Sequence, residues 1–204
     1  MIAAAALSLA LVAATDLSST GWKIAEPYGV THLDTTGWSI QFYDEYSLQQ
    51  AAPYAKLTAV ELEAHTGVDF YVGTTLHAWD QECPGYTSTG RHRIIIKIDP
   101  LEDRAHGTVC DTPAGAAESS KVTISDERWK TALRNSSNEV YRRNVISHEI
   151  GHSMGLLHPD TTALPYEDPL MTGAYWGGYS GTTTAHKYTQ YDISGLKHLV
   201  LNRP

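Results

Sequence analysis

Residues 148–158 of the chain read HEIGHSMGLLH and combine residue types that suit metal chemistry. His148 and His152 are four positions apart, so on a helix their rings project from one face and can hold one metal ion. Glu149 directly follows the first of these histidines, where its carboxylate can lean toward a metal-bound water and act as a general base. We therefore expect a metal-binding helix that carries its own proton acceptor.

Two further residues complete the pattern H-E-x-x-H-x-x-G-x-x-H. Gly155 is expected to end the helix, because glycine adopts a left-handed backbone conformation at little cost. The chain would then turn and bring His158 back as a third ligand. Three neutral imidazole nitrogens with an open fourth position indicate a catalytic zinc site rather than a closed structural one. A helix with surface histidines could match a bare H-E-x-x-H by chance, but the glycine and the third histidine set this segment apart.

The composition is that of a globular protein of 204 residues, of which 42% are hydrophobic and 19% are charged. This length suits one domain, or one domain with two lobes. The formal net charge is -8 and no run of Lys or Arg occurs, which argues against nucleic acid or an anionic membrane as partners. We expect a monomer whose partner is a protein or peptide substrate.

The first residues, 1–14, read MIAAAALSLALVAA and resemble the apolar region and small-residue cleavage site of a secretory signal peptide. This run is too short to span a bilayer, and no Lys or Arg precedes it. The sequence therefore predicts a secreted, extracellular protein whose mature domain comprises residues 15–204, with no membrane association in the mature form.

Cys83 and Cys110 are the two cysteines of the chain. In an exported protein such a pair most often forms one disulfide, which we predict here. The alternative is that Cys83 is a zinc-blocking thiol of an inhibitory pro-segment, although it lies within the folded region rather than in an N-terminal extension.

Strand and helix patterns are partly segregated along the chain, which favours an α+β fold. Alternating or β-branched residues predict strands at 38–43, 68–72, 94–98 and 121–125. Three- and four-residue spacing predicts helices at 47–66, 136–155 and 190–201. Pro53 would sit in the first turn of its helix, Ser136 and Glu139 form a capping box, and residues 99–120 are expected to be a long loop.

Three separate segments resemble the metzincin clan of zinc metallopeptidases, and most closely its matrixin-like members. They are HEIGHSMGLLHP, VTISDERW at 122–129 and TQYDISGLKHL at 189–199. The resemblance implies an α+β metzincin-like catalytic domain, in which a twisted mixed sheet packs on helices. The active-site cleft would lie between an upper subdomain, to about residue 155, and a small lower subdomain at residues 156–204.

The same resemblance assigns roles outside the zinc segment. Met171, in PLMTG, would form an apolar floor beneath the imidazoles in a tight Met-turn, whereas its residue type alone also suits ordinary core packing. Asp192 would support this turn or receive the mature N-terminus, whereas its position alone suits a charge near a helix N-terminus.

The chain departs from this clan's patterns at two places. Matrixins bind a second zinc and calcium ions through a loop rich in His and Asp, but His92, His106 and Asp111 lack that spacing here. Astacin-like and serralysin-like relatives place a tyrosine two residues after the methionine, where this chain has Gly173. We therefore expect one catalytic Zn2+ as the cofactor, and the sequence lends calcium no support.

Together these features predict a secreted zinc-dependent endopeptidase in which Glu149 serves as general base and then general acid. A metzincin of another branch would catalyse the same reaction with other accessory ions. A non-catalytic zinc-containing binding module is the alternative of a different class, although such a module needs no base at Glu149. For the substrate, we expect residues 94–98 and the loop after them to form the edge that pairs with a peptide, and residues 174–179, AYWGGY, to line a specificity pocket.

Overall fold

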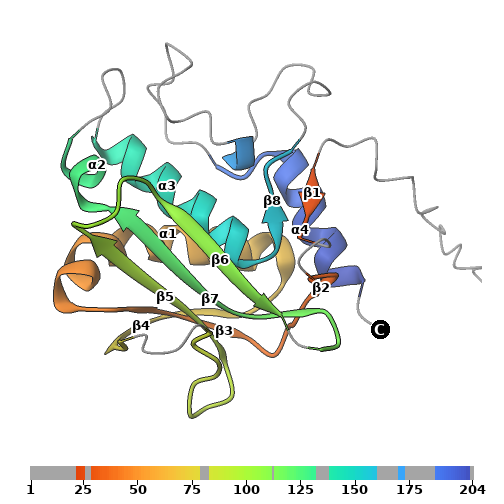
Figure 1. Cartoon of the computed structure of the whole chain (residues 1–204). Helices are drawn as coiled ribbons and strands as arrows, with labels where there is room; N and C mark the ends of the chain where they lie inside the picture. Colours follow the sequence, from red (N-terminus) through yellow and green to blue (C-terminus); the bar gives the residue numbers. More distant parts are fainter. Residues whose placement is uncertain are drawn as a thin grey trace, which may run out of the picture.

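The computed structural model describes most of the chain between Trp22 and Asn202. The described residues are 22–25, 29–78, 83–111, 113–131, 138–159, 170–172 and 187–202. Within them a mostly parallel β-sheet packs against helices, which confirms the predicted mixture of α and β structure (Figure 1). The segment predicted to be a signal peptide lies outside the described residues, and the division into two subdomains stays a prediction.

Five described strands form the parallel part of the sheet, in the order β2-β7-β5-β3-β4. Their bounds are His32–Leu33 for β2, Trp38–Phe42 for β3, Phe70–Leu76 for β4, His92–Asp99 for β5 and Ala116–Ser125 for β7. Strand β5 lies between β3 and β7, and its isoleucines 94, 95 and 96 are fully buried. The expectation that this strand forms the substrate-pairing edge is therefore wrong, because a continuous β-branched run is typical of a strand covered on both faces.

The segment after residues 94–98, the other part of that expectation, does contain an edge next to the predicted site, but as a strand that the sequence did not reveal. Strand β6 (His106–Asp111) pairs antiparallel with β7, and β7 is its one partner among the described strands. The prediction of a loop over residues 99–120 is thus wrong for both β6 and the first half of β7. Backbone hydrogen bonds hold these segments together, while sequences such as HGTVCD and AAESS show little of the apolar alternation that predicts a strand.

Helix α1 (Glu45–Thr66) covers the sheet with a face of small residues. It begins where the Asp44 carboxylate accepts a hydrogen bond of 2.7 Å from the Ser47 amide, and it ends at Gly67, whose φ is 69°. Pro53 lies inside the helix rather than in its first turn, contrary to the prediction. The buried face, which includes Ala51, thus outweighs the single helical hydrogen bond that proline cannot donate.

Helix α3 (Asn138–Ser153) lies beside α1 on the same face of the sheet (Figure 1). The hydroxyls of Thr58 and Ser147 are 2.8 Å apart across this contact, and Arg143 forms a buried ion pair of 2.7 Å with Glu61. Helix α2 (Asp126–Lys130) also packs on α3, and helix α4 (Gln190–Leu201) packs on α1. These contacts fix α3, the helix that contains the zinc segment, against the rest of the fold.

Cys83 and Cys110 form a disulfide, which confirms the predicted pair and leaves Cys83 no free thiol to block a metal. This bond links the segment before β5 to strand β6. Among the described residues, no helix combines the length and apolar character that crossing a membrane requires.

Candidate metal centre

Helix α3 presents His148, Glu149 and His152, as their spacing predicts. His148 and Glu149 are each only 1% exposed, whereas His152 is half-buried. The predicted N-terminal capping residue, Ser136, lies outside the described residues. The helix ends at Ser153, two residues before the glycine that was expected to end it.

Gly155 makes the turn that follows α3, as predicted. Its φ of 99° lies in the left-handed region, and a Cβ atom at this position would come within 2.8 Å of a Val30 methyl group. A residue with a side chain would therefore be strained by its backbone and would also clash. The chain then runs back as β8 (Leu156–Leu157), which pairs antiparallel with β1 (Lys23–Ile24) and places His158 opposite the helix.

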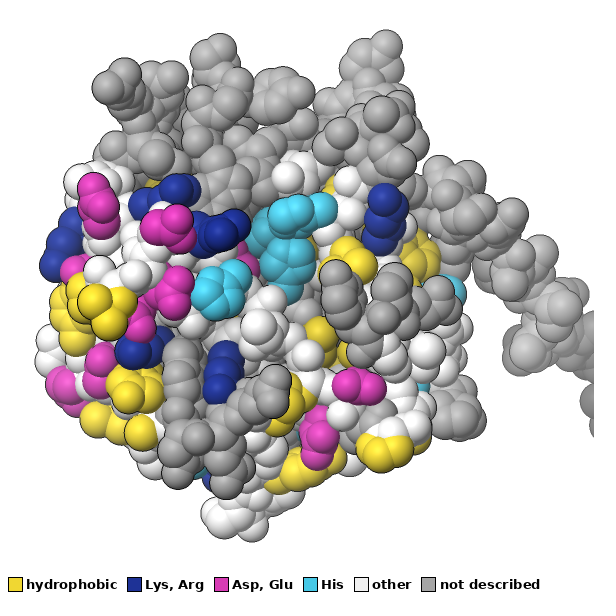
Figure 2. Space-filling view, viewed as in Figure 1, with side chains coloured by type: hydrophobic (Ala, Val, Ile, Leu, Met, Phe, Trp, Pro, Cys, Tyr) yellow, Lys and Arg dark blue, Asp and Glu magenta, His cyan; other side chains and the backbone are white. Residues whose placement is uncertain are grey.

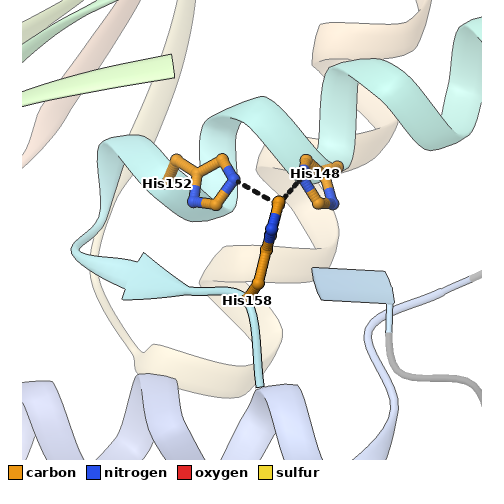
Figure 3. A group of neighbouring side chains, drawn as sticks. All are labelled: His148, His152 and His158. Carbon is orange, nitrogen blue, oxygen red and sulfur yellow. Dashed lines mark hydrogen bonds between the residues drawn. The ribbon is translucent and has the colours of Figure 1, made fainter. Parts of the chain in front are cut away.

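The three histidines face a common point (Figure 3). The Nε2 atom of His158 is 3.1 Å from Nε2 of His148 and 3.2 Å from Nε2 of His152. One ligand atom from each ring lies within 4.8 Å of the others, and this trio is the one group of potential metal ligands found in the described part of the chain. The structure thus brings together the three residues that the spacing singled out.

Backbone carbonyls determine which ring nitrogens of the helical histidines carry protons. Nδ1 of His148 is 2.8 Å from the Leu170 carbonyl oxygen, and Nδ1 of His152 is 2.7 Å from that of Leu156. A carbonyl can only accept, so each neutral ring must donate from Nδ1 and present a lone pair at Nε2. A neutral His158 has one proton to donate and cannot satisfy both lone pairs through Nε2. A cation at the common point would remove the remaining repulsion.

The surroundings keep these rings neutral. Burial depresses the pKa of all three histidines below the usual value of 6.5, and for His152 to about 4. For His148 the neighbouring His152 and His158 add electrostatic repulsion to the effect of burial. Neutral imidazoles are the form that binds a metal, so the site is ready for a cation at neutral pH.

An open cleft of about 910 Å³ lies over the trio. The trio and Glu149 line it together, with residues 106–109 of β6 along one side and Leu156 and Leu157 of β8 along the other. Figure 2 shows histidine side chains, in cyan, gathered at the surface of this face. A ligand from solvent can therefore reach both the nitrogen trio and the buried carboxylate.

A short 3-10 helix, η4 (Leu170–Thr172), lies against α3. Met171 is buried, and a Cβ atom on Gly151 would come within 2.4 Å of its sulfur, so the thioether packs directly on the helix between the two ligand positions. The Asp192 carboxylate accepts the backbone N–H groups of Leu170 at 2.9 Å and of Met171 at 3.2 Å.

Asp192 also accepts the backbone N–H of Thr189 at 2.8 Å, and it thereby closes the capping box at the start of α4. Asp192 thus contacts the segment around Met171, as expected, and lies in the first turn of α4, as its position predicted. The other expected role, receiving the mature N-terminus, concerns residues outside the described ranges.

Gly107, which no sequence pattern singled out, lets β6 lie directly on α3. A Cβ atom at this position would be 2.4 Å from the Glu149 carbonyl oxygen and 3.1 Å from the His152 Cβ. An isolated glycine in a short polar segment can indicate such a close backbone approach, but only once the segment is known to be a strand. The predicted pocket segment, residues 174–179, and Gly173 lie outside the described residues.

Comparisons with known proteins add little to this geometry. No protein-family model matches the chain, and no curated protein matches it. A solved structure described as the structure of myroilysin aligns with 66% of this chain at 12% identity and a TM-score of 0.36. The alignment spans 54% of the length of that protein. At this degree of similarity, the function of the present chain has to be inferred from its own site.

Proposed function

We propose that the protein is a zinc-dependent endopeptidase of the metzincin type, with His148, His152 and His158 as the metal ligands. One observation carries the proposal: three imidazole nitrogens converge in an open cleft, and two of them have lone pairs fixed by Nδ1 hydrogen bonds to backbone carbonyls. Such an arrangement is unfavourable without a cation and leaves room for a water or substrate oxygen.

The nitrogen donor set and its spacing suit zinc. Two nitrogens at about 2.05 Å from a tetrahedral zinc ion lie about 3.3 Å apart. The observed separations of 3.1 and 3.2 Å from the His158 nitrogen are close to that value. Three neutral imidazoles bind zinc well, whereas calcium and magnesium prefer oxygen ligands.

When bound, zinc would supply Lewis-acid chemistry, because it lowers the pKa of a coordinated water and polarises a peptide carbonyl. Glu149 would accept the proton of the attacking water and deliver it to the leaving amine. The carbonyls of Leu170 and Leu156 would hold the two helical imidazoles in the required tautomer and orientation.

Strand β6 would bind the substrate backbone. It lines the cleft and pairs only with β7 among the described strands, so its outer edge can add an extended peptide as a further strand. Met171 would form the apolar floor beneath the ligands, as its packing on Gly151 supports. The disulfide suits a secreted protein, which is the localisation that we propose together with cleavage of the signal at residues 1–14.

The first test is the Glu149→Gln variant, with metal content and casein cleavage measured in parallel. The variant should retain one zinc per chain, because no ligand is changed, and lose about 10²- to 10⁴-fold in kcat, because the proton acceptor is gone. Glu63→Gln, at an exposed position of α1, is the matched control and should change neither quantity.

Two outcomes would contradict the proposal. Full activity of Glu149→Gln would remove this residue from the reaction. A zinc-loaded wild-type chain that binds peptides but never cleaves them would instead support a binding module. Chelation should abolish cleavage and added zinc should restore it.

A further inference from the structure

The walls of the cleft have a charge opposite to that of the whole chain. The formal net charge of the protein is -8. Among the described residues that line the cleft, however, the charged side chains outside the trio are Lys23, Arg104 and Arg128, with Glu149 as the one carboxylate. His106 lines the same wall. The cleft is therefore a locally cationic region of an acidic protein, even before a divalent ion is counted.

Two arginines lie together at the end of the cleft next to α2. The carbonyl oxygen of Arg104 accepts a hydrogen bond of 3.1 Å from the backbone N–H of Ser125, and Ser125 is the N-cap of the helix that carries Arg128. Nε of Arg104 is 3.5 Å from an Asp103 oxygen, but this side chain is 72% exposed. An exposed pair of this kind is weak, so Arg104 can still attract a substrate carboxylate.

Arg128 is less exposed than Arg104. It is half-buried, and it lines the cleft together with Glu149. Burial raises the pKa of the Tyr141 hydroxyl. The charge of Arg128 lowers this pKa and the charge of Glu149 raises it, so both charged groups lie close enough to act on the same hydroxyl. A guanidinium presents its N–H donors in a planar fork that matches a carboxylate, so Arg128 is a residue type suited to recognising an acidic side chain.

Lys23 provides a cation on the other side of the trio. It lies on β1, opposite Leu157 of β8, and it is exposed. Figure 2 shows Lys and Arg side chains, in dark blue, on both sides of the cyan histidines. An extended peptide that crosses the trio would therefore meet positive charge before and after the scissile bond.

We propose that the cleft selects peptides with acidic side chains close to the scissile bond, and that Arg104 and Arg128 are specificity-determining residues. The inference rests on the proposed endopeptidase function, because it names the substrate class of the same site. The cationic walls would attract carboxylates of the substrate and would repel a basic peptide.

The test uses two fluorogenic peptides with the same core, one with Glu on both sides of the cleavage point and the other with Gln there. The zinc-loaded full chain should show about twofold to fivefold higher kcat/KM for the Glu peptide, the range expected of an ion pair near the surface. Arg128→Gln and Arg104→Gln should each bring this ratio closer to one. Raising the salt from about 0.05 M to about 0.5 M should have the same effect, because it screens exposed charges.

Lys130→Gln is the matched control. Lys130 is on the same helix as Arg128 and pairs with Asp126 at 2.6 Å, and it does not line the cleft. Its variant removes the same charge and should leave the peptide preference unchanged. Equal loss of preference in this control and in Arg128→Gln would point to net charge rather than to the cleft and would overturn the assignment.

Binding of the two peptides, measured by fluorescence anisotropy, separates this inference from the proposed function. If neither peptide is cleaved but the Glu peptide binds more tightly, the endopeptidase proposal fails and the acidic preference stands. If both are cleaved and bound equally, the reaction stands and the acidic preference is wrong. If neither peptide is cleaved or bound, both are wrong.

Discussion

His92 and His148 of the histidine trio are both buried, each only 1% exposed, but their ring nitrogens face different partners. The Nδ1 atom of His92 is 2.5 Å from the Glu118 carbonyl oxygen, and its Nε2 atom is 3.1 Å from an Asp34 oxygen. Its ring also stacks on Trp38 at 4.8 Å. Each nitrogen of His92 thus faces an oxygen atom of the protein rather than another imidazole.

In the trio, the two helical histidines have an oxygen partner at one ring nitrogen only. The Nδ1 atoms of His148 and His152 face carbonyls, but their Nε2 atoms face another imidazole, His158. This difference in the partners of Nε2 shows that burial by itself does not distinguish a metal centre from a structural histidine. Convergence of nitrogen lone pairs distinguishes it, because only a cation satisfies several of them at one point.

Replacing one histidine from each group gives the largest expected difference. His152→Ala should lose its zinc on dialysis and at least about 100-fold in activity, since even partners of metal ligands commonly account for that much. His92→Asn should keep one zinc per chain, although it lowers the free energy of unfolding. Metal analysis of both dialysed proteins checks this prediction. Zinc loss from His92→Asn alone would show that His92, and not His152, holds the metal.

Acidification should weaken the metal-free fold through the trio. A histidine whose pKa is depressed in the folded state stays neutral there while the unfolded chain takes up a proton. The stabilisation is complete above pH 6.5 and is lost as the pH falls toward about 4, the folded-state pKa of His152. For this residue the loss is up to about 3 kcal/mol, at about 1.4 kcal/mol per pKa unit.

Urea unfolding at pH 7.5 and at pH 4.5 measures this effect, with His152→Ala as the comparison. The variant should show a smaller change in unfolding free energy between the two pH values. Burial raises the pKa of Asp192, which contributes with the opposite sign but is present in both proteins. Identical pH dependence in the two proteins would show that His152 is not held neutral.

Gly107→Ala, in the strand that borders the site, should have the smallest effect of these variants. The added methyl group would meet the Glu149 carbonyl oxygen and push β6 away from α3, at about 1–3 kcal/mol of overpacking. Cleavage of extended peptides should show a raised KM, while zinc content stays the same. Gly73→Ala, in β4, is the matched control, since its nearest neighbour is a Tyr71 side-chain atom at 3.3 Å. Equal KM values for the two variants would argue against a role of β6 in peptide binding.

The metal trio could be predicted because its geometry is local. A four-residue spacing on a helix and one glycine turn are enough to predict that three nitrogens come together within 148–158. The central isoleucine strand and the helix at 190–201 could also be predicted, since their side chains show clear apolar patterns.

Strand β6 and the supports of the site could not be found in the same way. The carbonyl of Leu170 meets His148 across 22 positions, and Asp192 reaches back over a similar distance to the turn of Met171. These partners are mostly backbone groups, which every residue possesses, so no side-chain pattern reveals them.

The amino-acid sequence by itself determined which residues can hold a metal and which carboxylate lies next to them, because the spacing of residues along a helix fixes the face from which their side chains project. Only the tertiary structure decided which nitrogens present lone pairs, which strand borders the cleft and which charges line it. Those properties depend on contacts between distant segments, and the packing of β6 and η4 against α3 is what creates them.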